Sequence, residues 1–383
     1  MKAISFGRVS PFIATVSLVG VIGCIGAAPR PGMEPGPGVK AGKKGTFEAV
    51  HEFVIKAPEG ASVVKAWLPI PADSDRMQKV ESFRVESPVP DRIAHDELGN
   101  RYLYVERGAP AGGDLVVRTT FSVTRSEVNA DVDPAHTRPH TPDELAQLGQ
   151  YLVGSSQSVI DDNARELART VVGNETNPVR IARQVYDAVL ERVEYHVKDP
   201  KPDAQKTMKA TGTGSSQKCF ETCTGNCTDF HSLYAAVARA AGLPTREVYG
   251  SFFKGPLDGQ DKDQSYHCWI EFHAPNIGWI PLDVAVADIF VADFHANDHS
   301  RPRAELTVAN GYNGPSSQWV EYYFGNLEER RVSWHWGRDL VLDPPQAGPP
   351  LFWNATGYAE ADGKPVQVVR KLTYRQVKEV ARR

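Results

Sequence analysis

The sequence has little cysteine and no marked excess of either charge. Five cysteines in 383 residues are too few for the disulfide framework of a small secreted scaffold. The 43 basic and 47 acidic residues nearly cancel, so no basic surplus exists to neutralise the phosphates of a nucleic acid. The apolar stretch at residues 9–23 is too short and too broken by glycine and serine for a comfortable membrane span. The length predicts two or three domains.

The first 23 residues have the features of an export signal. Lys2 and Arg8 come early, an apolar stretch follows, and no acidic residue occurs before Cys24. The segment ends in Val21-Ile22-Gly23-Cys24, which resembles a bacterial lipobox, so we expect Cys24 to be lipidated and to anchor the protein at a membrane. An ordinary signal peptide cut a few residues downstream is the alternative. Both predict an exported protein, periplasmic or at the cell surface.

Four further segments are expected after the signal. Residues 24–45 are rich in glycine and proline and predict a semi-extended tether. Residues 46–130 contain short β-branched and aromatic runs separated by turn residues, which predict a β-sandwich. Helical signals then begin, including a capping box at Thr141, and residues 140–350 predict a larger domain of class α+β. Residues 351–383 form a C-terminal extension.

Cys227 is expected in the first turn of a helix. Apolar residues recur at helical spacing from Phe230 to residue 241, and Gly242 ends the run. Asn226 is the predicted N-cap, with Asp229 three residues later as its partner. Unpaired N–H groups and the helix dipole stabilise a thiolate at such a position. A buried structural cysteine is the alternative interpretation.

Two alternating segments predict an antiparallel hairpin. Residues 266–272 and 279–284 flank a turn that we centre on Pro275. In the register that buries the apolar residues on one side, His267 falls opposite Asp283 on the other. Directly paired side chains are close enough for a carboxylate to hold an imidazole N–H.

Cys227, His267 and Asp283 would then supply a nucleophile, a base and an orienting carboxylate for acyl transfer. His231, one helical turn after Cys227, is the rival base. The alternation of the strand and the pairing with Asp283 favour His267.

The residues around this triad resemble the bacterial transglutaminase-like family, a branch of the papain-like cysteine enzymes. The resemblance is carried by residues 225–246, by Tyr266-His267-Cys268-Trp269 and by residues 278–283, and it covers roughly residues 140 to 345. It implies a helix bearing Cys227 that packs on an antiparallel sheet bearing His267 and Asp283, preceded by a β-module.

The resemblance also implies an activity. The expected reaction is acyl transfer through a thioester on Cys227, by transamidation, deamidation or peptide hydrolysis. The expected substrate is a protein or peptide, including cell-wall peptide. No cofactor or metal is expected, because residues 258–263 are acidic but lack the ligand spacing of a calcium loop. A non-catalytic scaffold lipoprotein is the alternative function.

Four further residues near the triad have expected roles. Trp269 and Trp279 would wall the substrate pocket or pack the sheet edge. Cys268 would lie inert in the core. Gln217 is a candidate for the oxyanion hole, beside the backbone N–H of Cys227.

The regular spacing of three cysteines and a histidine leaves a metal site as a competitor. On one continuous helix the first and last of these residues would lie roughly 18 Å apart, too far for one zinc ion. A break at residues 224–226 would keep the metal site possible. The four residues of this possible metal site are Cys219, Cys223, Cys227 and His231. A disulfide between Cys219 and Cys223 also stays possible.

Overall fold

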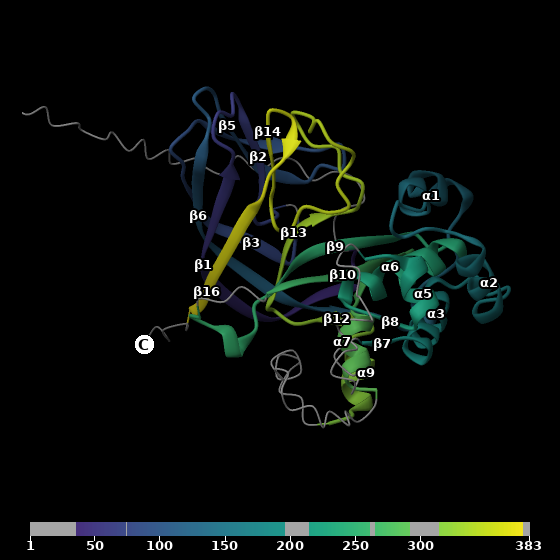
Figure 1. The fold of residues 1–383 in the computed structure, drawn as a ribbon. Helices are drawn as coiled ribbons and strands as arrows, with labels where there is room; N and C mark the ends of the chain where they lie inside the picture. Colours follow the sequence, from purple (N-terminus) through teal and green to yellow (C-terminus); the bar gives the residue numbers. More distant parts are fainter. Residues whose placement is uncertain (1–35, 74, 196–213, 261–264, 292–313, 378–383) are drawn as a thin grey trace, which may run out of the picture.

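The computed structural model describes residues 36–73, 75–195, 214–260, 265–291 and 314–377. The expected signal segment and Cys24 lie outside the described residues. Among the helices that are described, none is long and apolar enough to span a membrane. The chain combines helices with three antiparallel sheets, which confirms the predicted α+β class (Figure 1).

Two sheets face each other and form the expected β-sandwich. One contains β1 (Val39–Ala57), β3 (Gln78–Glu86), β6 (Gly113–Ala130), β12 (Asn326–Leu327) and β16 (Val368–Val377). The other contains β2 (Val64–Pro69), β4 (Asp91–His95), β5 (Arg101–Arg107), β14 (Tyr358–Ala361) and β15 (Lys364–Pro365). Inward side chains alternate with outward ones along β1, and Phe53, Leu68 and Val117 meet in the shared core.

The third sheet carries the candidate site. Its strand order is β11-β10-β9-β13, and its members are β9 (Thr245–Phe252), β10 (Tyr266–Ala274), β11 (Gly278–Leu282) and β13 (Arg331–Trp336). The helix α6 (Cys227–Ala240) packs on β9 and β10 and is almost wholly buried. In Figure 1 the helices lie on one side of this sheet and the β-sandwich on the other.

The structure describes six further helices, of which four pack against α6. The helices are α1 (Pro142–Gln147), α2 (Asp162–Val171), α3 (Pro178–Arg192), α5 (Ser216–Thr222), α7 (Val284–Ile289) and α9 (Ser317–Tyr322). Short 3-10 turns occur at η1 (Pro134–His136), η2 (Gly149–Tyr151) and η4 (Gly255–Leu257), and β7 (Glu194–Tyr195) pairs in parallel with β8 (Thr224–Gly225). The predicted capping box at Thr141 is confirmed at the start of α1.

Two amide side chains of the β-sandwich cover the outer edge of β13. Gln78 accepts from Ser333 N at 2.9 Å and donates to Ser333 O at 3.0 Å. Asn100 accepts from Trp336 N at 2.8 Å and donates to Trp336 O at 2.7 Å. Each amide therefore satisfies an edge residue as a neighbouring strand would, and the pairs tie the site-bearing sheet to the β-sandwich.

Chain segments from both ends of the sequence build the β-sandwich. β1 begins at Val39, inside the segment that the composition predicts as a tether, because residues 39–41 pair with the end of β6. After residue 350 the chain returns: β14 pairs with β2, and β16 pairs with β1. The C-terminal extension is therefore part of the two sheets.

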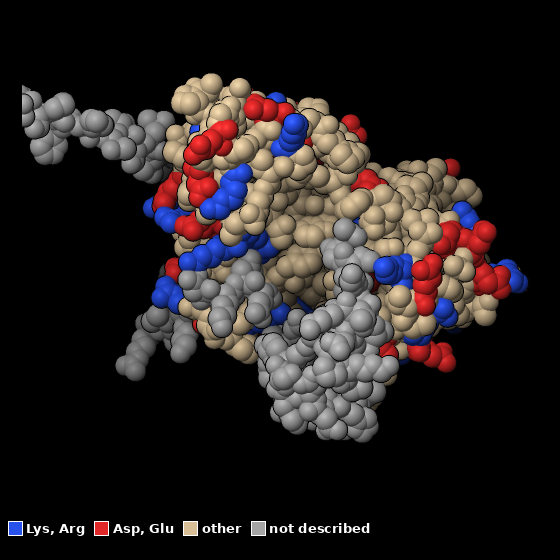
Figure 2. Space-filling model, in the orientation of Figure 1, with Lys and Arg blue, Asp and Glu red and all other residues tan. Residues whose placement is uncertain are grey.

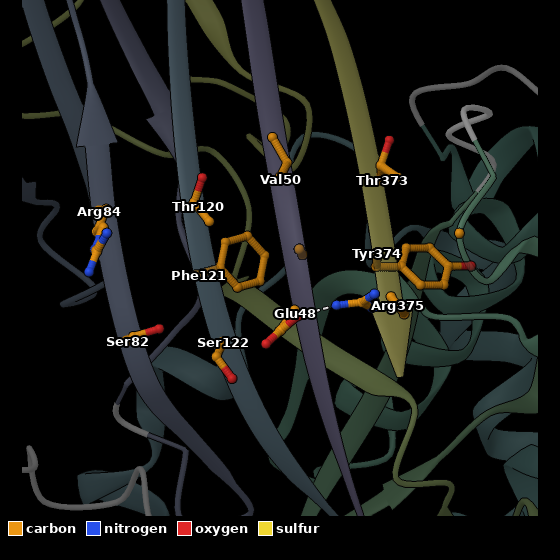
Figure 3. A pocket seen from close by; sticks show the side chains of 12 residues that line it. Glu48, Val50, Ser82, Arg84, Thr120, Phe121, Ser122, Thr373, Tyr374 and Arg375 are labelled. Atoms are coloured by element: carbon orange, nitrogen blue, oxygen red, sulfur yellow. Dashed lines mark hydrogen bonds and ion pairs between the residues drawn. The ribbon is translucent and has the colours of Figure 1, made fainter. Parts of the chain in front are cut away.

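The visible face of the molecule carries charges of both signs (Figure 2). Figure 2 shows acidic and basic side chains interspersed over the visible face, with a hollow of mostly uncharged side chains between the sheets and the helices. An open cavity of about 580 Å³ lies on the outer face of the first sheet, where Glu48, Arg84 and Arg375 line it (Figure 3). It shares no residue with the candidate site.

Candidate active site

Cys227 is the first residue of α6, as predicted. The side chain of Asn226 accepts from Thr228 N at 2.9 Å and from Asp229 N at 3.2 Å, while Asp229 accepts from Asn226 N at 3.0 Å. This capping box leaves the N–H of Cys227 outside the cap. Asp229 also accepts from Ser215 N at 3.0 Å, so one carboxylate fixes both the cap and the segment before α5.

His267 contacts Asp283 as the sequence predicts, although the two strands pair in a different register. The Nε2 atom of His267 lies 2.7 Å from Oδ2 of Asp283. The predicted register is wrong by two residues: Ile270 pairs with Leu282, and the turn is centred on Asn276 rather than on Pro275. A shift of two residues keeps every side chain on its face, which is why the contact survives.

Asp283 reaches His267 because the chain leaves the sheet at this point. Residue 283 follows β11 and is the N-cap of α7, where its Oδ1 atom accepts from Val286 N at 3.0 Å. The cap fixes one oxygen of the carboxylate, so the other points back to His267.

A buried arginine that sequence reasoning missed completes the surroundings of Asp283. Arg331, the first residue of β13, donates from Nη1 to Asp283 Oδ2 at 2.5 Å and from Nε to Glu328 at 2.8 Å. Arg331 and Asp283 are both 0 % exposed. A basic residue at the start of the run 331–336, in which Val332, Trp334 and Trp336 alternate with polar residues as in a strand, was the signal that could have indicated a buried ion pair.

His267 also contacts the thiol. Because its Nε2 atom faces Asp283, the Nδ1 side of the ring is left for the Cys227 side chain, with which it hydrogen-bonds. Burial alone would lower the pKa of His267, but the Asp283 carboxylate and the Cys227 thiolate raise that pKa to about 8. Burial would likewise raise the pKa of Asp283, yet His267 and Arg331 hold it well below its usual range.

The Cys227 thiol is activated by its neighbours. A hydrogen bond from Cys268 lowers the pKa of Cys227 well below that of an ordinary thiol; burial opposes this shift, and His267 and His231 reinforce it. The site therefore favours a thiolate beside an imidazolium, which is the reactive state of cysteine nucleophiles.

Cys268 and His231 make contacts that sequence reasoning missed. Cys268 does lie on the side of β10 that faces α6, but its surroundings are not inert, since its sulfur lies 3.2 Å from Nδ1 of His231. The Nε2 atom of His231 lies 3.3 Å from Asp283 Oδ1. His231 is thus directed to Cys268 and Asp283, whereas His267 makes the hydrogen bond to Cys227.

The two predicted pocket tryptophans are buried. Trp269 is 0 % exposed, and its ring lies over Gly250. Trp279 is 3 % exposed, stacks edge-on with Tyr151 at 4.7 Å and lies under the guanidinium of Arg246. The contacts described for them are with the body of the protein, and their role as walls of a substrate pocket stays a prediction.

A different aromatic pair lies beside the thiol. The hydroxyl of Tyr266 forms a hydrogen bond of 3.0 Å with Oγ1 of Thr228. That oxygen lies 3.8 Å from the sulfur of Cys227. The ring of Tyr266 stacks on Trp353 with centroids 4.9 Å apart, and both rings are half-buried. Trp353 belongs to the C-terminal extension, so no sequence motif around the triad could indicate it.

The competing metal and disulfide interpretations find no geometry in the described part of the chain. No group of three or more His, Cys, Asp or Glu residues described in the structure is arranged to hold a metal ion. Cys219 is buried, Cys223 is exposed, and both are free thiols. Gln217 donates to Asp161 at 3.1 Å and is exposed, so it faces away from the thiol.

Comparison with known proteins agrees with this geometry. Residues 165–284, which include Cys227, His267 and Asp283, match the sequence model of the transglutaminase-like superfamily. This part of the chain is transglutaminase-like.

Two relatives extend the similarity beyond the transglutaminase-like core. An uncharacterized protein of Haemophilus influenzae is 24 % identical over 345 residues, which cover 84 % of this chain and 87 % of that protein. A crystal structure from Cytophaga hutchinsonii, described provisionally as a cysteine protease, matches with a TM-score of 0.55 at 14 % identity and covers 89 % of this chain and 93 % of that one. The expected fold is confirmed, and the superfamily match supports cysteine-dependent acyl transfer or hydrolysis as the general class of activity.

Proposed function

We propose that this protein is an enzyme that transfers an acyl group from a carboxamide or peptide bond through a thioester on Cys227. The observation that carries the proposal is the contact of three groups: a Cys227 thiol with a lowered pKa, His267 against it, and Asp283 at 2.7 Å from the far side of the imidazole. A buried structural cysteine would need neither the imidazole nor the carboxylate.

The chemistry follows from the positions of the protons. The Cys227 thiolate attacks the carbonyl carbon, and Nδ1–H of the His267 imidazolium gives its proton to the leaving nitrogen as the carbon–nitrogen bond breaks. Ammonia or an amine leaves, and a thioester remains. The neutral imidazole then takes a proton from water or from an incoming amine, which resolves the thioester and restores the thiolate. Asp283 keeps Nε2–H of the ring engaged throughout, which fixes the tautomer and the orientation of the ring.

Negative charge on the carbonyl oxygen needs a donor at the site. The N–H of Cys227 is suited to this role, because the Asn226 side chain takes the next two N–H groups of α6 and leaves this one out of the cap. Tyr266 and Trp353 are the half-exposed side chains that would contact the substrate beside the reacting carbonyl.

The acceptor distinguishes the reactions that the site permits. Incubation with a glutamine-containing peptide and a primary amine probe, followed by mass spectrometry, separates amine incorporation, deamidation and chain cleavage in one experiment. We expect at least one of these products with the native protein and none with Cys227→Ala. If the native protein gives no product with any carboxamide or peptide, including cell-wall peptide, while Cys227 remains readily alkylated, the scaffold interpretation replaces the enzyme.

We further propose that the enzyme is exported and held at a membrane by a lipid on Cys24. The support is the sequence of residues 1–24 alone, with its basic start, apolar stretch and lipobox-like end. Cell fractionation tests it: the native protein should be recovered with membranes, and Cys24→Ala should release it or leave it unprocessed. A native protein that is found in the soluble fraction with the same mass as Cys24→Ala would overturn the anchor.

A further inference from the structure

A second cysteine lies against the sulfur of Cys227. Oγ1 of Thr228 lies 3.8 Å from each of the two sulfurs and accepts from Cys268. Cys268 is also the neighbour that most strongly lowers the pKa of Cys227. Cys268 is 1 % exposed, which is too little for it to meet a substrate. Any effect of Cys268 on the reaction must therefore pass through the side chains that it contacts.

Cys268 is held from its other side. His231 places Nδ1 at 3.2 Å from the Cys268 sulfur and Nε2 at 3.3 Å from Asp283 Oδ1. The two oxygens of Asp283 therefore contact two histidines: Oδ2 faces His267 and Oδ1 faces His231. His267 in turn lies against the side chain of Cys227, and His231 lies against the sulfur of Cys268. These contacts, together with the influence of His267 and Cys268 on the pKa of Cys227, link five side chains, which are Cys227, His267, Asp283, His231 and Cys268.

We propose that Cys268 is a positioning residue that donates its S–H to the Cys227 thiolate, and that His231 holds Cys268 in place for this donation. The proposal rests on the proposed role of Cys227 as the nucleophile. In the structure Nδ1 of His231 lies 3.2 Å from the Cys268 sulfur and can donate to it, and the S–H of Cys268 is directed to Oγ1 of Thr228 at 3.8 Å. This S–H turns from Thr228 to the neighbouring sulfur when Cys227 is ionised. A donor to the charged form of an acid favours that form, so the contact keeps Cys227 ionised.

The two thiols are suited to unequal roles. Burial and the neighbouring thiolate raise the pKa of Cys268 well above that of a free thiol, so Cys268 keeps the proton that it has to donate. Cys227 stands at the N-terminus of α6, where the helix favours a negative charge. Cys268 is thus suited to be the protonated donor and Cys227 to be the thiolate.

The other charged and titratable groups around the two sulfurs belong to five elements. They are His231 in α6, Tyr249 in β9, Tyr266 and His267 in β10, Asp283 at the start of α7, Arg331 in β13, and Arg338 after β13. None of them is removed by a substitution at Cys268. A change in the titration of Cys227 after that substitution therefore reports the lost sulfur.

The test is the pH dependence of alkylation of Cys227 by iodoacetamide, followed at that residue by peptide mass spectrometry. In Cys268→Ala we expect the inflection to move to higher pH, so that the alkylation rate at pH 6 falls roughly tenfold or more. Cys268→Ser keeps a donor and should recover most of the native rate. Cys219→Ala is the matched control, because Cys219 is equally buried but faces Asp229 and Arg192.

The outcomes separate the two proposals. An unchanged inflection in a folded Cys268→Ala, or an equal shift in Cys219→Ala, overturns the positioning role of Cys268. If Cys268→Ala does not fold, Cys268→Ser is compared with the native protein instead. The serine hydroxyl is also a donor, so a Cys227 alkylation inflection that lies far above the native pH in Cys268→Ser likewise overturns the positioning role of Cys268. Absence of any product with peptides, together with the expected shift, would instead overturn the enzymatic function and leave the thiol pair intact.

Discussion

The Oδ2 atom of Asp283 lies 2.7 Å from Nε2 of His267, and the same oxygen accepts from Arg331 at 2.5 Å. Oδ2 of Asp283 therefore contacts both the imidazole of His267 and the guanidinium of Arg331, which is always charged. The arginine keeps Asp283 ionised, and Asp283 in turn keeps the imidazole oriented and favours its protonated form.

Replacement of Asp283 by asparagine should impair catalysis without removing the side chain. The amide keeps the size of the carboxylate but loses the charge that raises the pKa of His267, so we expect kcat/KM to fall by at least about a hundredfold. Asp288→Asn is the control, because Asp288 is equally buried in α7 but accepts from Tyr195 N. Similar losses in both variants, measured by steady-state kinetics, would contradict the role of Asp283.

The pH profile of acylation should have an alkaline limb near pH 8. The imidazolium must protonate the leaving nitrogen, and its pKa of about 8 means that the proton is present below this pH and is lost as the pH rises through it. The limb should move to lower pH in Asp283→Asn, because the raising influence of the carboxylate is gone. Single-turnover release of ammonia or amine, measured from pH 5 to 10, checks both statements. A rate that keeps rising above pH 9 is the contrary result.

Arg331→Met should destabilise the fold strongly. It leaves the Asp283 and Glu328 carboxylates buried without their shared cation, and the loss of one partner from a buried ion pair costs about 3–5 kcal/mol. Urea unfolding at pH 7 measures the change. Arg375→Met, whose pair with Glu48 is exposed, should have a much smaller effect. Equal effects would mean that the buried network adds nothing beyond a surface pair.

Trp353→Ala should weaken substrate binding more than chemistry. Loss of the indole removes the partner that stacks on Tyr266, so we expect KM to rise roughly threefold to tenfold while alkylation of Cys227 is unchanged. Trp353→Phe should recover part of the affinity. Phe352→Ala is the neighbouring control, since Phe352 is 38 % exposed and has no described stacking partner. A fall in kcat with constant KM would place Trp353 in the chemistry instead.

The local parts of the site could be predicted from the sequence. The cap at Asn226, the helix that follows it and the alternation of β10 depend on short-range spacing, which is legible in one chain. The contact of His267 with Asp283 was also predictable, because face assignment has a period of two and tolerates the error in register.

The long-range parts could not be predicted. Arg331 reaches Asp283 from β13 and Trp353 reaches Tyr266 from the C-terminal extension, and no spacing rule links residues so far apart in the chain. The sequence indicated His231 as a rival base. Its contacts with Asp283 and Cys268 could not be predicted, because they depend on the packing of α6 against β10. Buried polar networks of this kind are set by tertiary structure.

The pairing of β16 with β1 sets an order of assembly. Thr46–Ile55 of β1 align with Val368–Val377, so one edge of β1 stays open during synthesis until the whole transglutaminase-like core has been made. The core thus lies, in the sequence, between two strands that pair with each other in one sheet. A chain that stops after the core would carry Cys227, His267 and Asp283 but would lack both the strand that seals β1 and the indole beside the thiol.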